Sequence, residues 1–211
     1  GPFLFVVNDW VFALLPATDF SARLIVALVG GLLPLSALLL RDRLSDAETV
    51  ALALVLAVNP LLVYYSRFMR SDVLVGAFAF VALGMVVRFV DRRRPRYLYG
   101  ATFFFALGVA AKENAILYLL TWLGAGVLVL DRALDRPGAE LTGAERLGAW
   151  TTAARDRLRV VTVPGPARRR AVRYAAHGLG AALVFAAVWL FMFAPRGDGI
   201  DGLYGPPGRA T

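Results

Sequence analysis

The segment YSRFMRSD, residues 65–72, places five polar or charged side chains between two long apolar segments. The apolar segments, residues 47–64 and 73–90, would each reach ~27 Å as a helix, close to the ~30 Å of a hydrocarbon core. Two arginines and an aspartate therefore lie where one membrane helix ends and the next begins. Ionisable groups so close to lipid are costly and are usually retained for a partner or a task. The segment thus indicates the edge of a functional site.

The composition is that of a membrane protein. The chain has 211 residues, 59% of them apolar, and its mean hydropathy is +0.64. Whole blocks of about 15–20 residues lack charge, where a soluble domain would show alternating or amphipathic patterns. These patterns predict an all-α polytopic membrane protein. The sequence contains no cysteine, which excludes disulfides and zinc–thiolate sites.

The net charge of +8 comes almost entirely from arginine, since Lys112 is the only lysine. Such a basic chain could suggest a nucleic-acid partner. The arginines, however, cluster in loops beside apolar spans, which the positive-inside rule explains more simply. We therefore predict that membrane lipid, and not nucleic acid, is a partner.

The apolar segments predict about six transmembrane helices and one helix in the outer membrane interface. Residues 2–15 are too short to cross ~30 Å, and Trp10 suits an interfacial position; the end of a truncated span is the alternative. The predicted spans are residues 22–40, 47–65, 73–90, 97–111, 115–130 and 174–194. The predicted organisation is an interfacial region (1–20), five spans (21–130), a basic loop (131–173), a sixth span (174–194) and an outer loop or tail (195–211).

Local motifs refine the first two spans. Pro34 predicts a kink, and Asn59-Pro60 predicts a bend just before the YSRFMRSD segment. Thr18 or Asp19 can cap the first span. Ser45, with Glu48 three residues later, fits a capping box that starts the second.

Charge predicts the sides of the membrane. Residues 41–46, 88–96 and 131–173 carry 2, 5 and 10 basic residues, against six for the rest of the chain. This bias makes the first set cytoplasmic, in a multi-pass protein of the plasma membrane. Residues 131–173 predict an amphipathic helix held by anionic lipid, or else a solvated linker. The YSRFMRSD segment and Lys112 then share the extracytoplasmic face.

The side chains on that face suit a phosphorylated lipid headgroup. Arginine donates to phosphate through a bidentate fork and lysine binds it as a point charge. Transfer of a sugar to a hydroxyl also needs a carboxylate, to take the proton or to orient a charged neighbour. The candidate cations are Arg67, Arg70, Lys112 and Arg23, and the candidate carboxylates are Asp72, Glu113 and, more weakly, Asp9.

Structural roles are the alternatives for these residues. Arg67 and Arg70 could snorkel to headgroups, and Asp72 could cap the following helix. Residues 112–114 could be a polar hairpin, and Arg23 an interfacial anchor. His177 is expected to be structural, and no nucleotide-binding loop is present, because the glycines at 30–31, 178 and 180 lie within apolar spans. We predict no metal site and no cofactor, and leave divalent-metal dependence open.

Four motifs in order carry a family resemblance: GPFLFVVNDWVFALLP, DFSARLIVALVGGLLPLSALLL, NPLLVYYSRFMRSDVL and GVAAKENAIL. Over about residues 1–130 the chain resembles the GT-C membrane glycosyltransferases. It is most similar to the dolichyl-phosphate-mannose protein mannosyltransferase-like group, and within it to an archaeal branch named as flippase-activity-associated. The resemblance implies an incomplete GT-C-like bundle in an N-terminally truncated fragment.

The resemblance also implies roles for residues. The family's main catalytic carboxylate lies in the first outer loop, upstream of a segment similar to residues 1–10, so we expect it before Gly1. Asp72 matches the family's second acidic position, and Lys112 its basic residue, with Glu113 beside it. The implied donor is a polyprenyl (dolichyl)-phosphate-linked sugar, and the implied acceptor is a protein or a glycan outside the membrane.

Two functions fit these observations. The first is a glycosyltransferase in which Arg67, Arg70 and Lys112 bind lipid phosphate and Asp72 assists the loop carboxylate. The second is a non-catalytic flippase-associated or transporter protein that only binds the lipid-linked sugar. An acidic residue shortly upstream of Gly1 would favour the enzyme. The sequence does not identify the sugar, the acceptor, the oligomeric state or the total number of spans.

Overall fold

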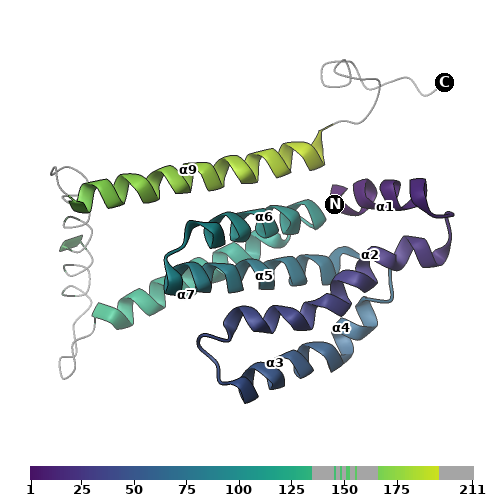
Figure 1. The fold of residues 1–211 in the computed structure, drawn as a ribbon, viewed down its shortest axis with the longest axis horizontal. Helices are drawn as coiled ribbons and strands as arrows, with labels where there is room; N and C mark the ends of the chain where they lie inside the picture. The colour runs from purple at the N-terminus through teal and green to yellow at the C-terminus, as the bar shows by residue number, and fades with distance from the viewer. Residues whose placement is uncertain (135–144, 146–147, 149–150, 153–154, 156–165, 195–211) are drawn as a thin grey trace. The chain divides into compact units, whose positions relative to one another are not determined.

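A computed structural model describes residues 1–134, 145, 148, 151–152, 155 and 166–194, and every regular element among these residues is a helix. Figure 1 shows the helices in chain order. They are α1 (Pro2–Leu14), α2 (Asp19–Leu32), the 3₁₀ helix η1 (Leu33–Leu40), α3 (Asp46–Val58), α4 (Pro60–Tyr65), α5 (Ser71–Arg92), α6 (Pro95–Ala111), α7 (Ala115–Leu134) and α9 (Pro166–Phe193). The predicted all-helical class is therefore confirmed over the described part of the chain.

The chain divides into two compact units. The first consists of Gly1–Ala115 and Ala181–Thr211, and it contains every predicted site residue. The second is Ile116–Gly180, described mainly through α7 and the first half of α9. Most of the basic loop predicted over 131–173 and the tail at 195–211 lie outside the described residues, so their predicted structures stay predictions.

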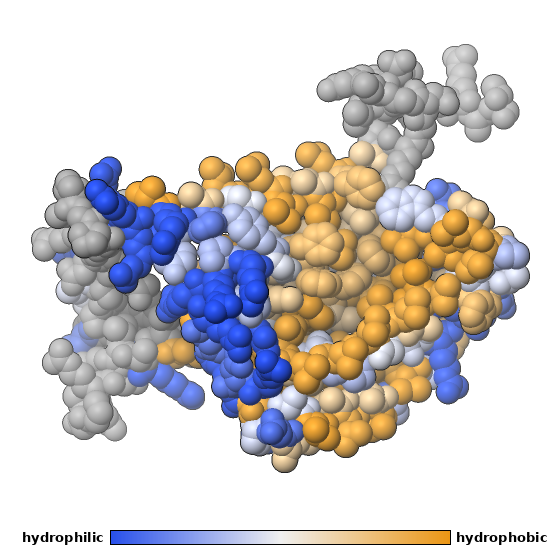
Figure 2. Space-filling model, viewed as in Figure 1, coloured by the Kyte–Doolittle hydropathy of each residue, from blue (hydrophilic) through white to orange (hydrophobic). Residues whose placement is uncertain are grey.

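Three helical segments among the described residues are long and apolar enough to cross a membrane: Asp19–Leu40, Ser71–Arg92 and Arg168–Phe193. Large apolar side chains are exposed along many of the helices, and Figure 2 shows them as a broad hydrophobic surface. Such a surface would be unfavourable in water, but it is stable when it is buried in the hydrocarbon core of a membrane. The integral-membrane class is thus supported, whereas the count of six spans stays a prediction, because three predicted spans form shorter or broken helices.

The second span is interrupted at the predicted position, and the first changes its helix type beside Pro34. The residues after Leu32 continue as η1, with Pro34 in its first turn. The second span divides into α3 and α4 at Asn59, whose φ of −57° and ψ of 118° are not helical. The Asn59 Oδ1 atom accepts hydrogen bonds from the N–H groups of Leu61 and Leu62 at 3.0 and 3.2 Å. Asn59 therefore ends one helix and caps the next.

The predicted helix starts are confirmed as well. Thr18 caps α2, and its hydroxyl accepts from the N–H of Ser21 at 3.3 Å. Ser45 caps α3 through a reciprocal capping box with Glu48, whose carboxylate accepts from the Ser45 N–H at 2.8 Å. These caps fix where α2 and α3 begin.

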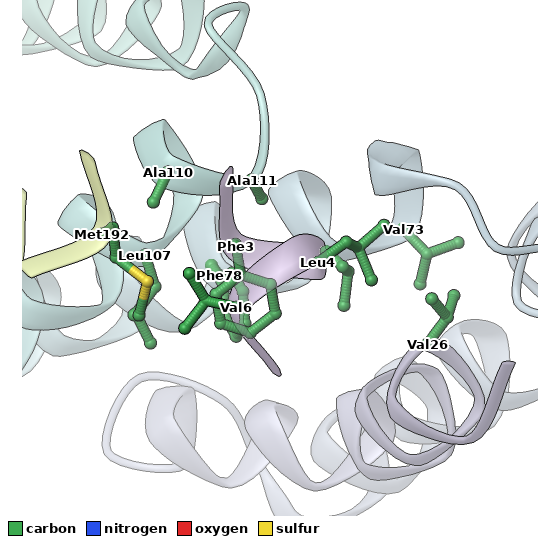
Figure 3. Packing of buried hydrophobic residues seen from close by; sticks show 11 residues of the cluster. Phe3, Leu4, Val6, Val26, Val73, Phe78, Leu107, Ala110, Ala111 and Met192 are labelled. Carbon is green, nitrogen blue, oxygen red and sulfur yellow. The ribbon is translucent and has the colours of Figure 1, made fainter. Parts of the chain in front are cut away.

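The core of the first unit lies where α1, α2, α5 and α6 meet. Figure 3 shows side chains from these helices pointing toward one another, with the Phe3 and Phe78 rings 5.1 Å apart in an edge-to-face arrangement. The cluster consists of Phe3, Leu4, Val6, Val26, Val73, Leu74, Phe78, Leu107, Ala110, Ala111 and Met192. The residues predicted as an interfacial segment thus form a helix, α1, with one face in this core. Its location in the membrane interface stays a prediction.

Helix α5 organises the first unit from end to end. Asp72 lies in its first turn and Asp91 in its last turn, and 19 residues of α-helix rise ~28 Å, about the thickness of a hydrocarbon core. Val73, Leu74, Val75, Ala77, Phe78 and Ala79 are buried between these ends. The two aspartates therefore mark two polar ends separated by an apolar middle.

Candidate functional site

The predicted YSRFMRSD segment forms the turn between α4 and α5. Backbone N–H groups of Arg67, Phe68 and Arg70 donate to the carbonyls of Tyr64, Tyr65 and Phe68 at 3.2, 3.3 and 2.8 Å. These bonds close a compact turn that leaves the arginine side chains available for other partners. Arg70 then takes an extended conformation as the N-cap residue of α5.

Asp72 does not cap α5, which corrects one alternative reading of this residue. The helix begins at Ser71, so Asp72 is already inside the first turn, and Arg70 provides no side-chain cap. A capping carboxylate would accept from backbone N–H groups. The Asp72 carboxylate instead contacts two cations.

Lys112 and Arg70 contact the two oxygens of the Asp72 carboxylate. Lys112 Nζ lies 2.6 Å from Oδ1 and Arg70 Nε lies 3.0 Å from Oδ2. About a third of the Asp72 and Lys112 side chains is exposed. Three residues that are up to 42 positions apart in the chain therefore form one cluster with a net charge of +1, which we call the Asp72 cluster.

The end of α6 brings Lys112 to this cluster. Ala110 and Ala111 are fully buried, and the Lys112 N–H donates to the Gly108 carbonyl at 3.0 Å, closing the helix. The backbone at Lys112 is then extended, with φ −161° and ψ 138°. The buried helix end thus fixes the position of the lysine backbone, and the side chain reaches Asp72 on the neighbouring helix.

The cations of the Asp72 cluster keep hydrogen-bond donors available. Arginine has five N–H donors and an ammonium has three, whereas the contacts with Asp72 use Nε of Arg70 and one N–H of Lys112. The Arg70 guanidinium also lies over the Tyr65 ring, 5.5 Å from its centroid. Arg70 is therefore held from two sides, and its terminal N–H groups can still bind an anion.

Arg67 and Arg23 line a separate pocket of about 280 Å³. The pocket lies between α2 and the α4 region, and its other lining residues are Ala27, Gly30, Gly31, Leu56, Ala57, Leu62, Val63 and Ser66. Arg23 also contacts the exposed Asp19 at 3.2 Å. Arg67 forms no ion pair with any residue that the structure describes. We call this site the Arg67 pocket.

Glycines give the Arg67 pocket its width. A Cβ atom on Gly30 would lie 2.9 Å from the Ser66 Cβ atom, too close for van der Waals contact, so a side chain there would push into the turn. A Cβ atom on Gly31 would meet no atom within 4 Å. Gly30 thus permits the close approach of α2 and Ser66, whereas Gly31 leaves open space.

Two predicted carboxylates do not join either group. Glu113 is exposed and forms no ion pair with a described residue, although it directly follows Lys112. Asp9 is likewise exposed, on α1. His177 lies in α9, in the other unit. No group of three or more His, Cys, Asp or Glu side chains suited to a metal ion occurs among the described residues.

The sequence reasoning missed the division of the site into two groups. Arg67 and Arg70 were predicted to bind the lipid phosphate together, but the chain turns between α4 and α5. Arg67 lines the Arg67 pocket, whereas Arg70 contacts Asp72. It also missed the paired charges at the opposite end of α5, where Arg43 contacts Asp91 and Arg92 contacts Asp42. The available indication was an aspartate beside arginines in each of the two loops, Asp42 in residues 41–46 and Asp91 in residues 88–96.

Comparison with known proteins places this chain in a family. The family model described as dolichyl-phosphate-mannose-protein mannosyltransferase matches residues 1–145, more than half of the chain, and includes both site groups. No curated protein and no solved structure gave a match. The order of the motifs around Asp72 and Lys112 and the all-helical membrane bundle agree with the family match. The chain therefore belongs to the dolichyl-phosphate-mannose-protein mannosyltransferase family.

Proposed function

We propose that this chain carries part of the site of a membrane glycosyltransferase. The enzyme would move a sugar from a polyprenyl-phosphate-linked donor to a protein or glycan acceptor at the extracytoplasmic face. The family match supports the donor class, and the 17-to-6 distribution of basic residues supports the face. The observation that carries the proposal is the convergence of Lys112 and Arg70 on Asp72.

The geometry favours Asp72 as a positioning residue. Each of its oxygens already contacts a cation, at 2.6 and 3.0 Å, so the carboxylate is better placed to orient those cations than to remove a proton from an acceptor. Neutralising one positive charge also allows two cations to lie close together near lipid at lower cost. The remaining donors of Arg70 and Lys112 would bind phosphate oxygens of the donor.

The Arg67 pocket supports a second contact with the donor. Arg67 and Arg23 are the only charged residues among those that line it, and the rest of the lining is apolar apart from Ser66. Such a lining suits an anionic headgroup joined to a hydrocarbon chain. Because Ser66 and Arg67 are connected to Asp72 by a short turn, one extended lipid headgroup would be able to contact both groups.

The acid–base step is assigned to other carboxylates. The family resemblance implies a main catalytic carboxylate other than Asp72 and Glu113. Glu113 is the carboxylate next to Lys112 that has no ion-pair partner in the described part of the chain, so it would be able to contact the acceptor. We propose Glu113 as an assisting catalytic residue.

The test is sugar transfer by the full-length protein in lipid vesicles, with dolichyl-phosphate mannose as the donor. Both the glycosylated acceptor and the released polyprenyl phosphate are measured. We expect Asp72→Asn and Arg70→Ala to lower turnover by about 10²-fold, the usual effect of removing a preorganised charge. The matched control is Asp46→Asn, which makes the same charge change at the exposed start of α3.

The same assay separates transfer from transport. A protein that only binds the lipid-linked sugar would move it between leaflets without releasing polyprenyl phosphate. Normal turnover in both Asp72→Asn and Arg70→Ala would show that the assigned roles are wrong. Movement of the donor without transfer would show that the enzyme class is wrong.

A further inference from the structure

At the end of α5 opposite Asp72, two bidentate ion pairs join α5 to the loop after η1. Arg92 donates to both oxygens of Asp42 at 2.7 and 2.8 Å, and Arg43 donates to both oxygens of Asp91 at 2.6 to 3.2 Å. Each pair joins the loop after η1 to the last turn of α5. Both oxygens of each aspartate therefore accept hydrogen bonds from one arginine.

Arg88 forms a third link between the same elements. Its Nε and Nη2 atoms donate to the carbonyls of Leu39 and Leu38 at 2.8 and 2.6 Å. Carbonyl groups at the end of a helix lack intrahelical partners, and a cation is well suited to bind them. The Arg88 guanidinium thus satisfies the end of η1 and is held in place near the start of α6.

Three further arginines at this end have no acidic partner among the described residues. Arg41, Arg94 and Arg96 are exposed and form no ion pair there. Arg41 directly precedes Asp42, which contacts Arg92, and Arg94 and Arg96 begin α6 two and four residues after Arg92. The three charges therefore surround one junction, which we call the arginine rim.

Tyr97 holds one member of the arginine rim in position. Its side chain is 7% exposed, and its hydroxyl accepts a hydrogen bond from Nη2 of Arg96 at 3.0 Å. The guanidinium carbons of Arg96 and Arg88 lie 4.9 and 6.0 Å from the centre of its ring. Arg96 is thus oriented by a buried platform and keeps Nε and Nη1 for another partner.

Apolar surface adjoins the arginine rim. Leu35 and Leu38 lie one turn apart on η1, 60% and 52% exposed, and Arg41 follows Leu38 by one more turn of three residues. Figure 2 shows the hydrophilic residues gathered at this end of the unit and hydrophobic residues directly beyond them. A ligand at the rim would therefore contact cations with one end and hydrocarbon with the other.

We propose that the arginine rim binds the phosphodiester headgroup of an anionic phospholipid, with its acyl chains along Leu35 and Leu38. A phospholipid fits both features, since its headgroup carries the negative charge and its chains are apolar. In the topology proposed above this is a lipid of the cytoplasmic leaflet. The site lies at the opposite end of α5 from Asp72, so it is independent of the glycosyl donor.

The test uses the full-length protein in a neutral detergent, with palmitoyl-oleoyl phosphatidylglycerol or phosphatidylcholine added. Native mass spectrometry counts the lipids that stay bound and gives their affinities. We expect one phosphatidylglycerol to bind much more tightly than phosphatidylcholine. The double variant Arg94→Gln/Arg96→Gln should weaken it roughly 30-fold, as the product of about 5-fold for each arginine.

A matched double variant separates a site from general attraction. Arg132→Gln/Arg173→Gln removes the same charge from α7 and α9 and should leave the tight phosphatidylglycerol in place. Tyr97→Phe, which keeps the charge of the rim and removes the hydroxyl that accepts from Arg96, should weaken binding by a few-fold. Equal losses in both double variants would overturn the proposal, as would equal binding of the two lipids or competition by free glycerol phosphate.

A second measurement covers the case in which the double variant fails to fold. A phosphatidylglycerol with a photoreactive acyl chain is cross-linked to the unaltered protein, and the labelled peptides are identified. Labelling concentrated on residues 35–41 and 94–97 is the expected result. Labelling spread evenly over the apolar surface would contradict the proposal.

Discussion

Lys112 Nζ lies 2.6 Å from Asp72 Oδ1 and joins the end of α6 to the start of α5. The two residues are 40 positions apart, so the pair exists only because α5 and α6 pack as an antiparallel hairpin. Arg70 contacts the other Asp72 oxygen. Removing either partner therefore disturbs the same three-residue cluster.

The Asp72–Lys112 pair predicts strongly non-additive variants. We expect Asp72→Asn and Lys112→Met each to lower transfer about 10²-fold, since each disorganises the cations that bind the donor phosphate. The double variant should be hardly worse than either single one, because the interaction is already lost. Turnover of the four proteins at saturating donor completes the cycle. Fully multiplicative losses would show that the two residues act separately.

The Arg67 pocket predicts different effects for substitutions at its two neighbouring glycines: a higher KM for the donor at Gly31 and a lower protein stability at Gly30. Gly31→Leu should fold normally, since its Cβ atom enters open space, and should raise the KM for the lipid donor about tenfold by filling the pocket, which corresponds to ~1.4 kcal/mol. Gly30→Ala should instead destabilise the protein by about 1–3 kcal/mol, because its Cβ atom meets Ser66. Thermal unfolding and donor titration distinguish the two. An unchanged KM in Gly31→Leu would exclude the pocket as a donor site.

The Arg92–Asp42 pair predicts a loss of stability at acidic pH. The hydrogen bond from Arg92 lowers the pKa of the Asp42 carboxyl below its ordinary 3.8. A depressed pKa in the folded state gives stability that is present above the unfolded pKa and is lost as the pH falls through the folded value. We expect the thermal midpoint to fall below about pH 4 more steeply in the unaltered protein than in Asp42→Asn. Parallel pH profiles would contradict this assignment.

We expect substitution of Arg88 to lower the stability of the protein without lowering turnover at the Asp72 cluster. Arg88→Gln removes the charged donor from the Leu38 and Leu39 carbonyls, and we expect a loss of about 1–2 kcal/mol. Turnover measured well below the unfolding temperature should stay within about twofold, since the Asp72 cluster lies ~24 Å away along α5. The control is Arg168→Gln, at an exposed position of α9.

The sequence predicted those parts of the fold that depend on local chemistry. The capping residues Thr18 and Ser45 and the break at Asn59-Pro60 are determined by short-range hydrogen bonds and by proline geometry, and all are present. The segment of residues 73–90, apolar apart from Arg88, likewise lies in the uninterrupted helix α5. Hydrophobic patterning alone identifies such elements.

Other features depend on packing between distant segments, which a single sequence does not reveal. The burial of Phe3, Leu4 and Val6 arises because α1 packs on α2 and α6. The separation of Arg67 from Arg70 follows from the turn at residues 66–70. Asp72 stands out in the sequence by its charge beside an apolar helix, but its contacts with Lys112 and Arg70 depend on the packing of α5 and α6.

The most direct test of the central claim is the release of polyprenyl phosphate from dolichyl-phosphate mannose by the full-length protein in vesicles, compared with Asp72→Asn. The account predicts acceptor-dependent release by the unaltered protein and a loss of about 10²-fold in the variant, with Asp46→Asn unaffected. Equal release by the unaltered protein and Asp72→Asn would contradict the assignment of this cluster to the donor site.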